Sequence, residues 1–222
     1  MQNITQPTFQ FLKALKKHND RDWFKDHKKD YEKAKKEFTD FIDALIVEVA
    51  KFDKDIAHFS AKDTIFRIHR DVRFSKDKSP YKTHFGAHIT SAPKRSEIHT
   101  RAGYYIHLEP GASMLAGGAY LPEGSWLKAI RQEIHYNADS LKKIINDPGF
   151  KKYFNMEGEK LKTAPRDYPK DHPEIELLKH KSFLAVHHCD DKEVLSDEFL
   201  KHCAGAFKAL YPFDQFLNQA SE

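Results

Sequence analysis

The sequence is poor in cysteine and has no long apolar run, and these absences exclude several classes of protein. Its 222 residues include only Cys189 and Cys203, without the CxxC spacing or second pair that a zinc site or a disulfide framework needs. We expect both to be reduced core residues. The apolar run at 44–47 stops at Glu48, far short of the roughly 20 residues of a membrane span. Because Met1 to Ile4 lack the features of a secretory signal, we expect a soluble cytoplasmic protein with no membrane attachment.

The common nucleotide and nucleophile motifs are also missing. The sequence contains no GxGxxG, no GxxxxGK[ST] and no GxSxG pattern, which excludes the dinucleotide fingerprint, the P-loop and the hydrolase elbow. It has no Gly-, Ser- or Pro-rich linker and no internal repeat. We therefore predict a single domain over residues 1–222.

The charge balance is only mildly basic. The chain has 37 Lys and Arg residues against 33 Asp and Glu residues, a formal net charge of +4. Such a charge is far from that of a histone-like binder, so net charge alone does not indicate nucleic acid.

Both ends of the chain show helical spacing. Apolar residues behind Thr8, a residue suited to N-capping, predict a short helix that ends near His18. Steps of three and four predict a long amphipathic helix from about 22 to 52, and the two helices would form a hairpin. Helical spacing returns after Pro122, at a helix start near 171–174, and from 196 to 217 with a break near Pro212.

The middle third changes to a period of two, which is typical of strands. We predict strands near 64–73, 83–91, 101–109 and 112–120, with turns at 75–80, 92–95 and 110–111, and a final strand at 182–188. Short connections imply an antiparallel meander. The predicted fold class is α+β, with the N-terminal helical hairpin and the C-terminal helices packed mainly on one face of the sheet.

Alternation along these strands separates an apolar face from a polar face. The helices should cover the apolar face, which contains Phe66, Ile68, Val72, Phe74, Phe85, Ala87, Ile89, Tyr104, Ile106 and Leu108. The other face contains Arg67, His69, Asp71, Arg73, His84, Gly86, His88, Arg101, Gly103, Tyr105, His107 and Glu109. Arg, His, Tyr and Glu suit forked hydrogen bonding, proton transfer and stacking, so this face is the candidate ligand site. A structural ion-pair network is the alternative.

The loop from Ser75 to Lys82 adds three ammonium groups beside the polar face. The candidate ligand-binding residues are therefore Arg67, Arg70, Arg73, Lys76, Lys78, Tyr81, Lys82 and Tyr105, unless the loop is only a solvated basic turn. Strict alternation places Arg70 on the apolar side. Either a bulge near Arg70 and Asp71 returns it to the polar face, which we favour, or it pairs with a carboxylate under a helix.

Histidines and carboxylates on the same face are candidates for catalysis. His107 or His69 could move a proton, and Glu109 or Asp71 could orient it. His84 and His88 could combine with neighbouring residues to hold a metal. Because nothing resembles HExxH spacing, we predict no metal and no cofactor.

Three blocks of the sequence carry a family resemblance. They are residues 66–82, residues 103–111 and residues 165–173, the last followed by 177–183. Through these blocks the chain resembles the family called domain of unknown function 2461, from about Phe9 to Leu217. The resemblance implies one domain and brings no established activity. Family members typically read Arg-Asp-Thr-Arg where this chain has Val72 in third place, so a hydroxyl is not essential there.

These observations lead to three hypotheses of function. The first is binding of a phosphate-bearing or other anionic ligand, either a nucleotide or a nucleic-acid strand, by the basic residues named above. The second is an enzyme that acts on an anionic substrate, with acid-base catalysis by His and Glu and charge stabilisation by Arg. The third is a structural or interaction module without a small ligand, and the sequence identifies no protein partner.

Overall fold

The computed structural model describes residues 2–92 and 99–220, and contacts between Cα atoms divide the chain into two compact units. Unit 1 comprises Met1–Ile89, Tyr105–Leu115 and His188–Gly205, and unit 2 comprises Thr90–Tyr104, Ala116–His187 and Ala206–Glu222. The single domain expected from the sequence stays a prediction. The predicted turn at 92–95 lies, from residue 93 on, outside the described residues.

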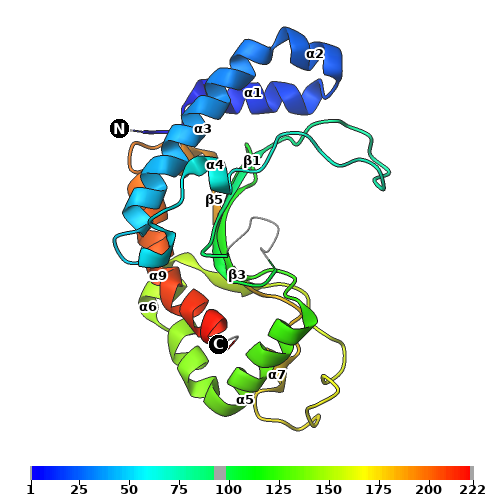
Figure 1. The fold of residues 1–222 in the computed structure, drawn as a ribbon, viewed down its shortest axis with the longest axis vertical. Helices are drawn as coiled ribbons and strands as arrows, with labels where there is room; N and C mark the ends of the chain where they lie inside the picture. The colour runs from blue at the N-terminus through cyan, green and yellow to red at the C-terminus, as the bar shows by residue number, and fades with distance from the viewer. Residues whose placement is uncertain (1, 93–98, 221–222) are drawn as a thin grey trace. The chain divides into compact units, whose positions relative to one another are not determined.

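Unit 1 begins with a helical hairpin, as predicted. Helix α1 (Gln6–Lys17) is followed by α2 (Arg21–Asp26) and α3 (Lys28–Val49), and α1 and α3 contact each other side by side (Figure 1). The predicted N-cap was wrong, because Thr5 precedes the helix and donates to Glu37 at 2.7 Å. The predicted long helix is interrupted at His27, whose backbone (φ −101°, ψ 19°) leaves the helical region.

The sheet has five strands in the described residues, β1 (Phe85–Ile89), β2 (Gly103–Leu108), β3 (Ser113–Ala119), β4 (Asn155–Glu157) and β5 (Phe183–Cys189), in the order β1-β2-β3-β5-β4. The antiparallel sheet and the α+β class are confirmed. The meander holds for the first three strands, and β5 then lies between β3 and β4.

The strand predicted at 64–73 was wrong. Only isolated bridges pair this segment, Ile65 with Ala87 and His69 with Tyr81. Beyond them the chain bends, because the Asp71 carboxylate accepts a hydrogen bond from the backbone N–H of Arg73, two residues on, at 3.2 Å. Such a local bond gives the backbone an alternative to a strand ladder.

The predicted apolar face is confirmed where strands formed. Its residues on β1 and β2 are buried, and α3 and α4 (Ala61–Thr64) contact β1. Phe38 of α3 stacks on Phe85 with ring centroids 5.4 Å apart. Outside the strands the prediction failed for Phe74, which is 96% exposed. Without a ladder, alternation along the chain no longer sorts side chains between two faces.

The remaining helices include α5 (Gly124–Ile145), which is kinked at Asn137, α6 (Pro148–Tyr153) and α7 (Ile175–Leu178). The closing helix α9 (Phe199–Gln219) contains Pro212 without ending there. The short elements η1 (Lys54–Ile56), α4 and α8 (Asp191–Val194) were not predicted. None of the helices in the described residues is both long enough and apolar enough to cross a bilayer.

Candidate functional site

A polar pocket of about 340 Å³ lies in unit 1. Its walls come from the end of α1, from Asn19 shortly after that helix, and from residues between 70 and 84, which lead into β1. The lining residues are Lys16, Asn19, Arg70, Asp77, Ser79, Tyr81, Lys82, Thr83 and His84. Asn19 fastens the loop to the helical hairpin, because its side chain donates to the Tyr81 carbonyl at 2.9 Å and accepts from the Tyr81 N–H at 3.0 Å.

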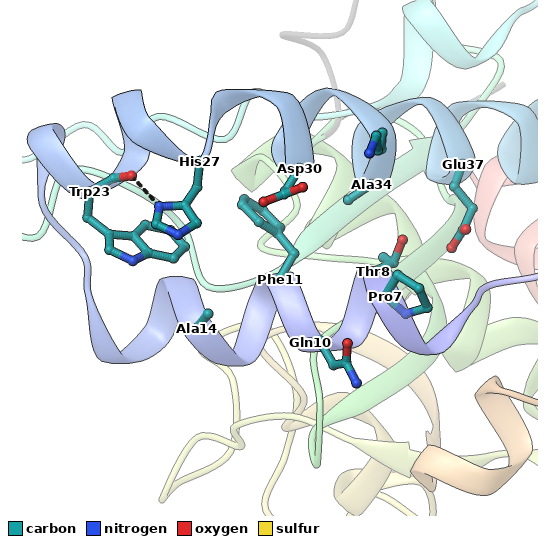
Figure 2. Close-up of a pocket in the computed structure, with 11 residues that line it drawn as sticks. Pro7, Thr8, Gln10, Phe11, Ala14, Trp23, His27, Asp30, Ala34 and Glu37 are labelled. Atoms are coloured by element: carbon teal, nitrogen blue, oxygen red, sulfur yellow. Dashed lines mark hydrogen bonds between the residues drawn. The ribbon is translucent and has the colours of Figure 1, made fainter.

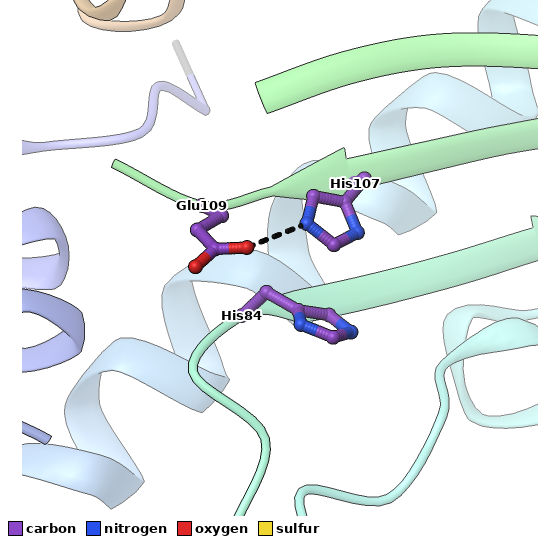
Figure 3. A group of neighbouring side chains, drawn as sticks. All are labelled: His84, His107 and Glu109. Carbon is purple, nitrogen blue, oxygen red and sulfur yellow. Dashed lines mark hydrogen bonds and ion pairs between the residues drawn. The ribbon is translucent and has the colours of Figure 1, made fainter. Parts of the chain in front are cut away.

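His84 is also part of a cluster of three side chains, the His84–His107–Glu109 cluster (Figure 3). His84 directly precedes β1, His107 lies on β2, and Glu109 follows the last residue of β2. Nε2 of His107 is 3.1 Å from Oε2 of Glu109, and the two imidazole rings have centroids 4.0 Å apart. The strand pairing of β1 with β2 therefore brings together residues that lie more than twenty positions apart in the sequence.

Further polar groups hold this cluster in place. The Lys16 ammonium and the Thr83 hydroxyl donate to Oε1 of Glu109 at 3.1 and 3.0 Å. The Tyr105 hydroxyl is 3.0 Å from Nδ1 of His107. Because a Cβ on Gly86 would lie only 3.1 Å from the Tyr105 hydroxyl, a glycine there leaves room for the Tyr105 ring.

Burial and neighbouring charges shift the acid-base properties of the cluster. Burial, together with the nearby imidazole of His107, lowers the pKa of His84 to about 4, so His84 is neutral at physiological pH. Burial acts to raise the pKa of Glu109, but hydrogen bonds from His107, Lys16 and Thr83 outweigh it and lower that pKa below its ordinary value. Glu109 is therefore a carboxylate, and its side chain is only 15% exposed.

Lys82 is the cation of the pocket whose charge is least compensated. Its side chain is half-buried and lies over the Phe66 ring, with Nζ 5.1 Å from the ring centroid. No acidic residue in the described parts of the chain forms an ion pair with it. Burial and the charge of Arg67 both lower the pKa of Lys82. Arg67 itself is exposed.

Arg70 lines the pocket, but its side-chain contacts all go to residues 75–79 of the loop and stabilise that loop. Its guanidinium forms an ion pair with Asp77 and donates to the Ser79 carbonyl at 3.1 Å and to the Ser75 hydroxyl at 3.3 Å. Both predictions for Arg70 were wrong, because its segment is not a strand that could bulge and its carboxylate partner is an exposed loop residue. The guanidinium fork instead closes the loop onto itself.

The other predicted ligand-binding residues are dispersed outside the pocket. Arg73 is 76% exposed and forms a forked ion pair with Asp71, with a shortest distance of 2.7 Å. Lys78 donates to the Val72 carbonyl at 3.0 Å, and Lys76 is exposed. Their roles in ligand binding stay predictions.

Among the predicted catalytic residues, the structure brings His107 and Glu109 together and places the other two elsewhere. Asp71 pairs with Arg73, and His69 is exposed, with its ring edge against Tyr81 at 5.2 Å between centroids. Lys16 and Thr83 were not predicted from the sequence. Lys16 is one of several lysines on an exposed helix face, and no sequence signal separates it from the others.

A second pocket, of about 390 Å³, lies between α1 and α3 (Figure 2). Trp23 and His27 stack at one end with centroids 4.0 Å apart, and His27 Nδ1 is 2.8 Å from the Trp23 carbonyl. Pro7 and Glu37 lie at the other end. Its polar groups, among them His27, Asp30 and Glu37, are spread along the helices and do not converge on one point (Figure 2), so this pocket resembles a helix-packing groove more than a site built for a ligand.

The fold and the site define an α+β protein in which a polar pocket adjoins a cluster of two histidines and a glutamate. Among protein families, the one described as conserved hypothetical protein (DUF2461) matches residues 7–216. The chain belongs to this family. No curated protein and no solved structure shows a significant match to the chain.

Proposed function

We propose that the polar pocket binds a small phosphate-bearing or carboxylate ligand, for example a nucleotide. The position of Lys82 carries the proposal. Lys82 lines the pocket together with His84 and is half-buried, and its ammonium has no carboxylate partner among residues 2–92 and 99–220. A buried cation is costly unless an opposite charge accompanies it.

An anion in the pocket would relieve two unfavourable effects at once. The Lys82 charge has lost part of its hydration, and it lies close enough to Arg67 for the two positive charges to repel. A phosphate or carboxylate would replace the missing water and offset the repulsion. Lys16 lines the same pocket, and its ammonium has N–H donors beyond the one that binds Glu109, so it can also bind the remaining ligand oxygens.

The volume and the lining residues of the pocket favour a small ligand over a nucleic-acid strand. Small-molecule pockets typically occupy about 300–1,000 Å³, and this pocket has about 340 Å³. Arg73, Lys76 and Lys78, which would contact successive phosphates of a strand, do not line it.

Calorimetric titration of the chain with inorganic phosphate, AMP, ATP and a short oligothymidylate tests the proposal. We expect a mononucleotide to bind and to raise the melting temperature. Lys82→Met should lower the affinity at least about tenfold, because a charge-assisted hydrogen bond contributes about 1.5–3 kcal/mol. The matched control is Lys152→Met, since Lys152 Nζ also lies over an aromatic ring, at 5.0 Å from the Tyr153 centroid.

Three results would contradict the proposal. One is unchanged affinity in Lys82→Met. Another is binding of the oligonucleotide alone, with an affinity that falls steeply as salt increases, which would indicate a strand on the basic surface. The third is no binding of any probe, which would favour the structural or interaction module.

The contacts of His107 favour an enzyme as the second candidate function. His107 lies between the Tyr105 hydroxyl and the Glu109 carboxylate, at 3.0 and 3.1 Å, and its side chain is only 12% exposed. A histidine that a carboxylate orients through one ring nitrogen can exchange a proton through the other. Here that other nitrogen faces the Tyr105 hydroxyl, so Tyr105 would relay the proton to or from the ligand. If a phosphate ester that binds is also turned over, His107→Gln should reduce turnover about 100-fold or more and leave ligand affinity nearly unchanged. Equal turnover in the variant would exclude this role.

A further inference from the structure

We propose that His84, His107 and Glu109 form a binding site for a divalent transition-metal ion of the Zn²⁺ type. One nitrogen from each histidine and one carboxylate oxygen all lie within 4.8 Å of one another. Figure 3 shows the two rings and the carboxylate gathered at the adjacent ends of β1 and β2. The inference goes beyond the anionic ligand proposed above and does not depend on it.

The distances match what a shared metal requires. Zn²⁺ binds imidazole nitrogen and carboxylate oxygen at about 2.0–2.2 Å, so two ligand atoms on one ion lie roughly 3 to 3.5 Å apart. His107 Nε2 and Glu109 Oε2 are already separated by 3.1 Å. Metal binding uses the tautomer of His107 that carries its proton on Nδ1, where the Tyr105 hydroxyl can accept it. The third donor, from His84, needs only a small side-chain rotation to complete the set, since it lies within 4.8 Å of the other two.

The surroundings of the cluster match the outer shell of known metal sites. A metal-bound histidine usually engages a partner through its other ring nitrogen, and Nδ1 of His107 is 3.0 Å from the Tyr105 hydroxyl. A ligating carboxylate is usually hydrogen-bonded as well. Here Lys16 and Thr83 bind Oε1 of Glu109, which leaves Oε2 for the metal.

The donor types select the class of metal. Imidazole suits Zn²⁺ and its transition-metal neighbours, whereas Mg²⁺ prefers oxygen ligands alone. Three protein ligands leave a coordination position open, as in catalytic rather than structural zinc sites. Because His84 also lines the polar pocket, that open position would be accessible from the pocket to water or to an oxygen of a ligand.

The experiment uses the full chain without an affinity tag, freed of metals with a chelator and then dialysed. Calorimetric titration should show one equivalent of Zn²⁺, bound at least about 100-fold more tightly than Mg²⁺. His107→Gln should lower the Zn²⁺ affinity by at least roughly tenfold to 100-fold. The matched control is His135→Gln, because His135 and His172 form another close histidine pair, with nitrogens 2.7 Å apart. It should leave Zn²⁺ binding unchanged.

The metal-free melting temperature of each variant checks that it folds. If His107→Gln is unfolded, Glu109→Gln replaces it, because glutamine keeps an oxygen for Lys16 and Thr83 while removing the ligand charge. The inference is overturned if wild-type protein binds Zn²⁺ no more tightly than Mg²⁺, if the folded cluster variant keeps wild-type affinity, or if His135→Gln abolishes binding. Lys82→Met should not weaken Zn²⁺ binding, because it removes a positive charge that acts on His84, so failure of the anion proposal would be recognised separately.

Discussion

Replacing Lys82 by methionine should destabilise the ligand-free protein less than the same replacement of Lys152. Both ammonium groups lie over an aromatic ring, at 5.1 and 5.0 Å from the centroid. Losing such a contact costs about 0.5–1 kcal/mol at an exposed site, and Lys152 is exposed. At Lys82 the same loss is offset, because burial and the Arg67 charge both disfavour the charged ammonium. Removing the ammonium removes these two unfavourable effects as well. Methionine keeps most of the aliphatic side chain in each case.

We therefore expect Lys152→Met to lower the free energy of unfolding by about 0.5–1 kcal/mol and Lys82→Met to leave it unchanged or raise it. Urea unfolding of both variants, with equal dependence on denaturant, measures the difference. Because the expected difference comes from an uncompensated charge at Lys82, greater destabilisation by Lys82→Met than by Lys152→Met would refute it. That result would mean that Lys82 stabilises the fold of the ligand-free protein and is not an uncompensated charge suited to binding a ligand.

Three further predictions concern single residues elsewhere in the structure. Hydrogen bonds from Arg73 lower the pKa of Asp71 to about 2, so any stabilisation by this carboxylate is present above its ordinary pKa of 3.8 and lost as the pH falls through 2. In Arg73→Gln, the carboxyl carbon signal of Asp71 should titrate by NMR at a higher pH than in the wild type but still below 3.8, because the backbone N–H of residue 73 keeps its hydrogen bond to the carboxylate. An unchanged midpoint would contradict the ion pair. Gly118→Ala should destabilise by more than about 2 kcal/mol in urea unfolding, because Gly118 has φ +106° and a Cβ would lie 2.0 Å from a backbone carbonyl of β5. Gly111→Ala, with φ +78° and no atom within 4 Å, should cost only about 1–2 kcal/mol, and equal losses would argue against the close packing at β3. Burial raises the pKa of Cys189 to about 12, and Cys203 is buried as well. A thiol reagent should therefore label neither cysteine in the native protein and both after unfolding. Rapid labelling of the native protein would show that the thiols are accessible.

Helices, strands and buried faces were predicted correctly from the sequence where the spacing of apolar residues follows their burial. The amphipathic pattern located the body of α3, and alternation sorted the residues of β1 and β2 onto the correct faces. The same alternation misled at 64–73, where Asp71 and Arg73 satisfy each other locally and the chain turns away from the sheet. Period alone does not distinguish a paired strand from an extended loop.

The candidate site was predictable only in part. His107 and Glu109 lie two residues apart on one strand, so alternation placed them together from the sequence. Lys16 reaches Glu109 from a position 93 residues away, and that contact depends on how the helical hairpin packs in unit 1. The polar pocket arises in the same way, since the Asn19 side chain fixes the loop at Tyr81. Contacts between distant segments are set by tertiary packing, which no local pattern records.

A crystal structure of the protein with the tightest-binding phosphate compound tests the central claim most directly. We predict that the phosphate lies in the polar pocket, within hydrogen-bond distance of Lys82 Nζ and beside His84. A phosphate bound instead at the exposed part of the loop near Arg73 and Lys76, with the pocket filled only by water, would contradict the claim.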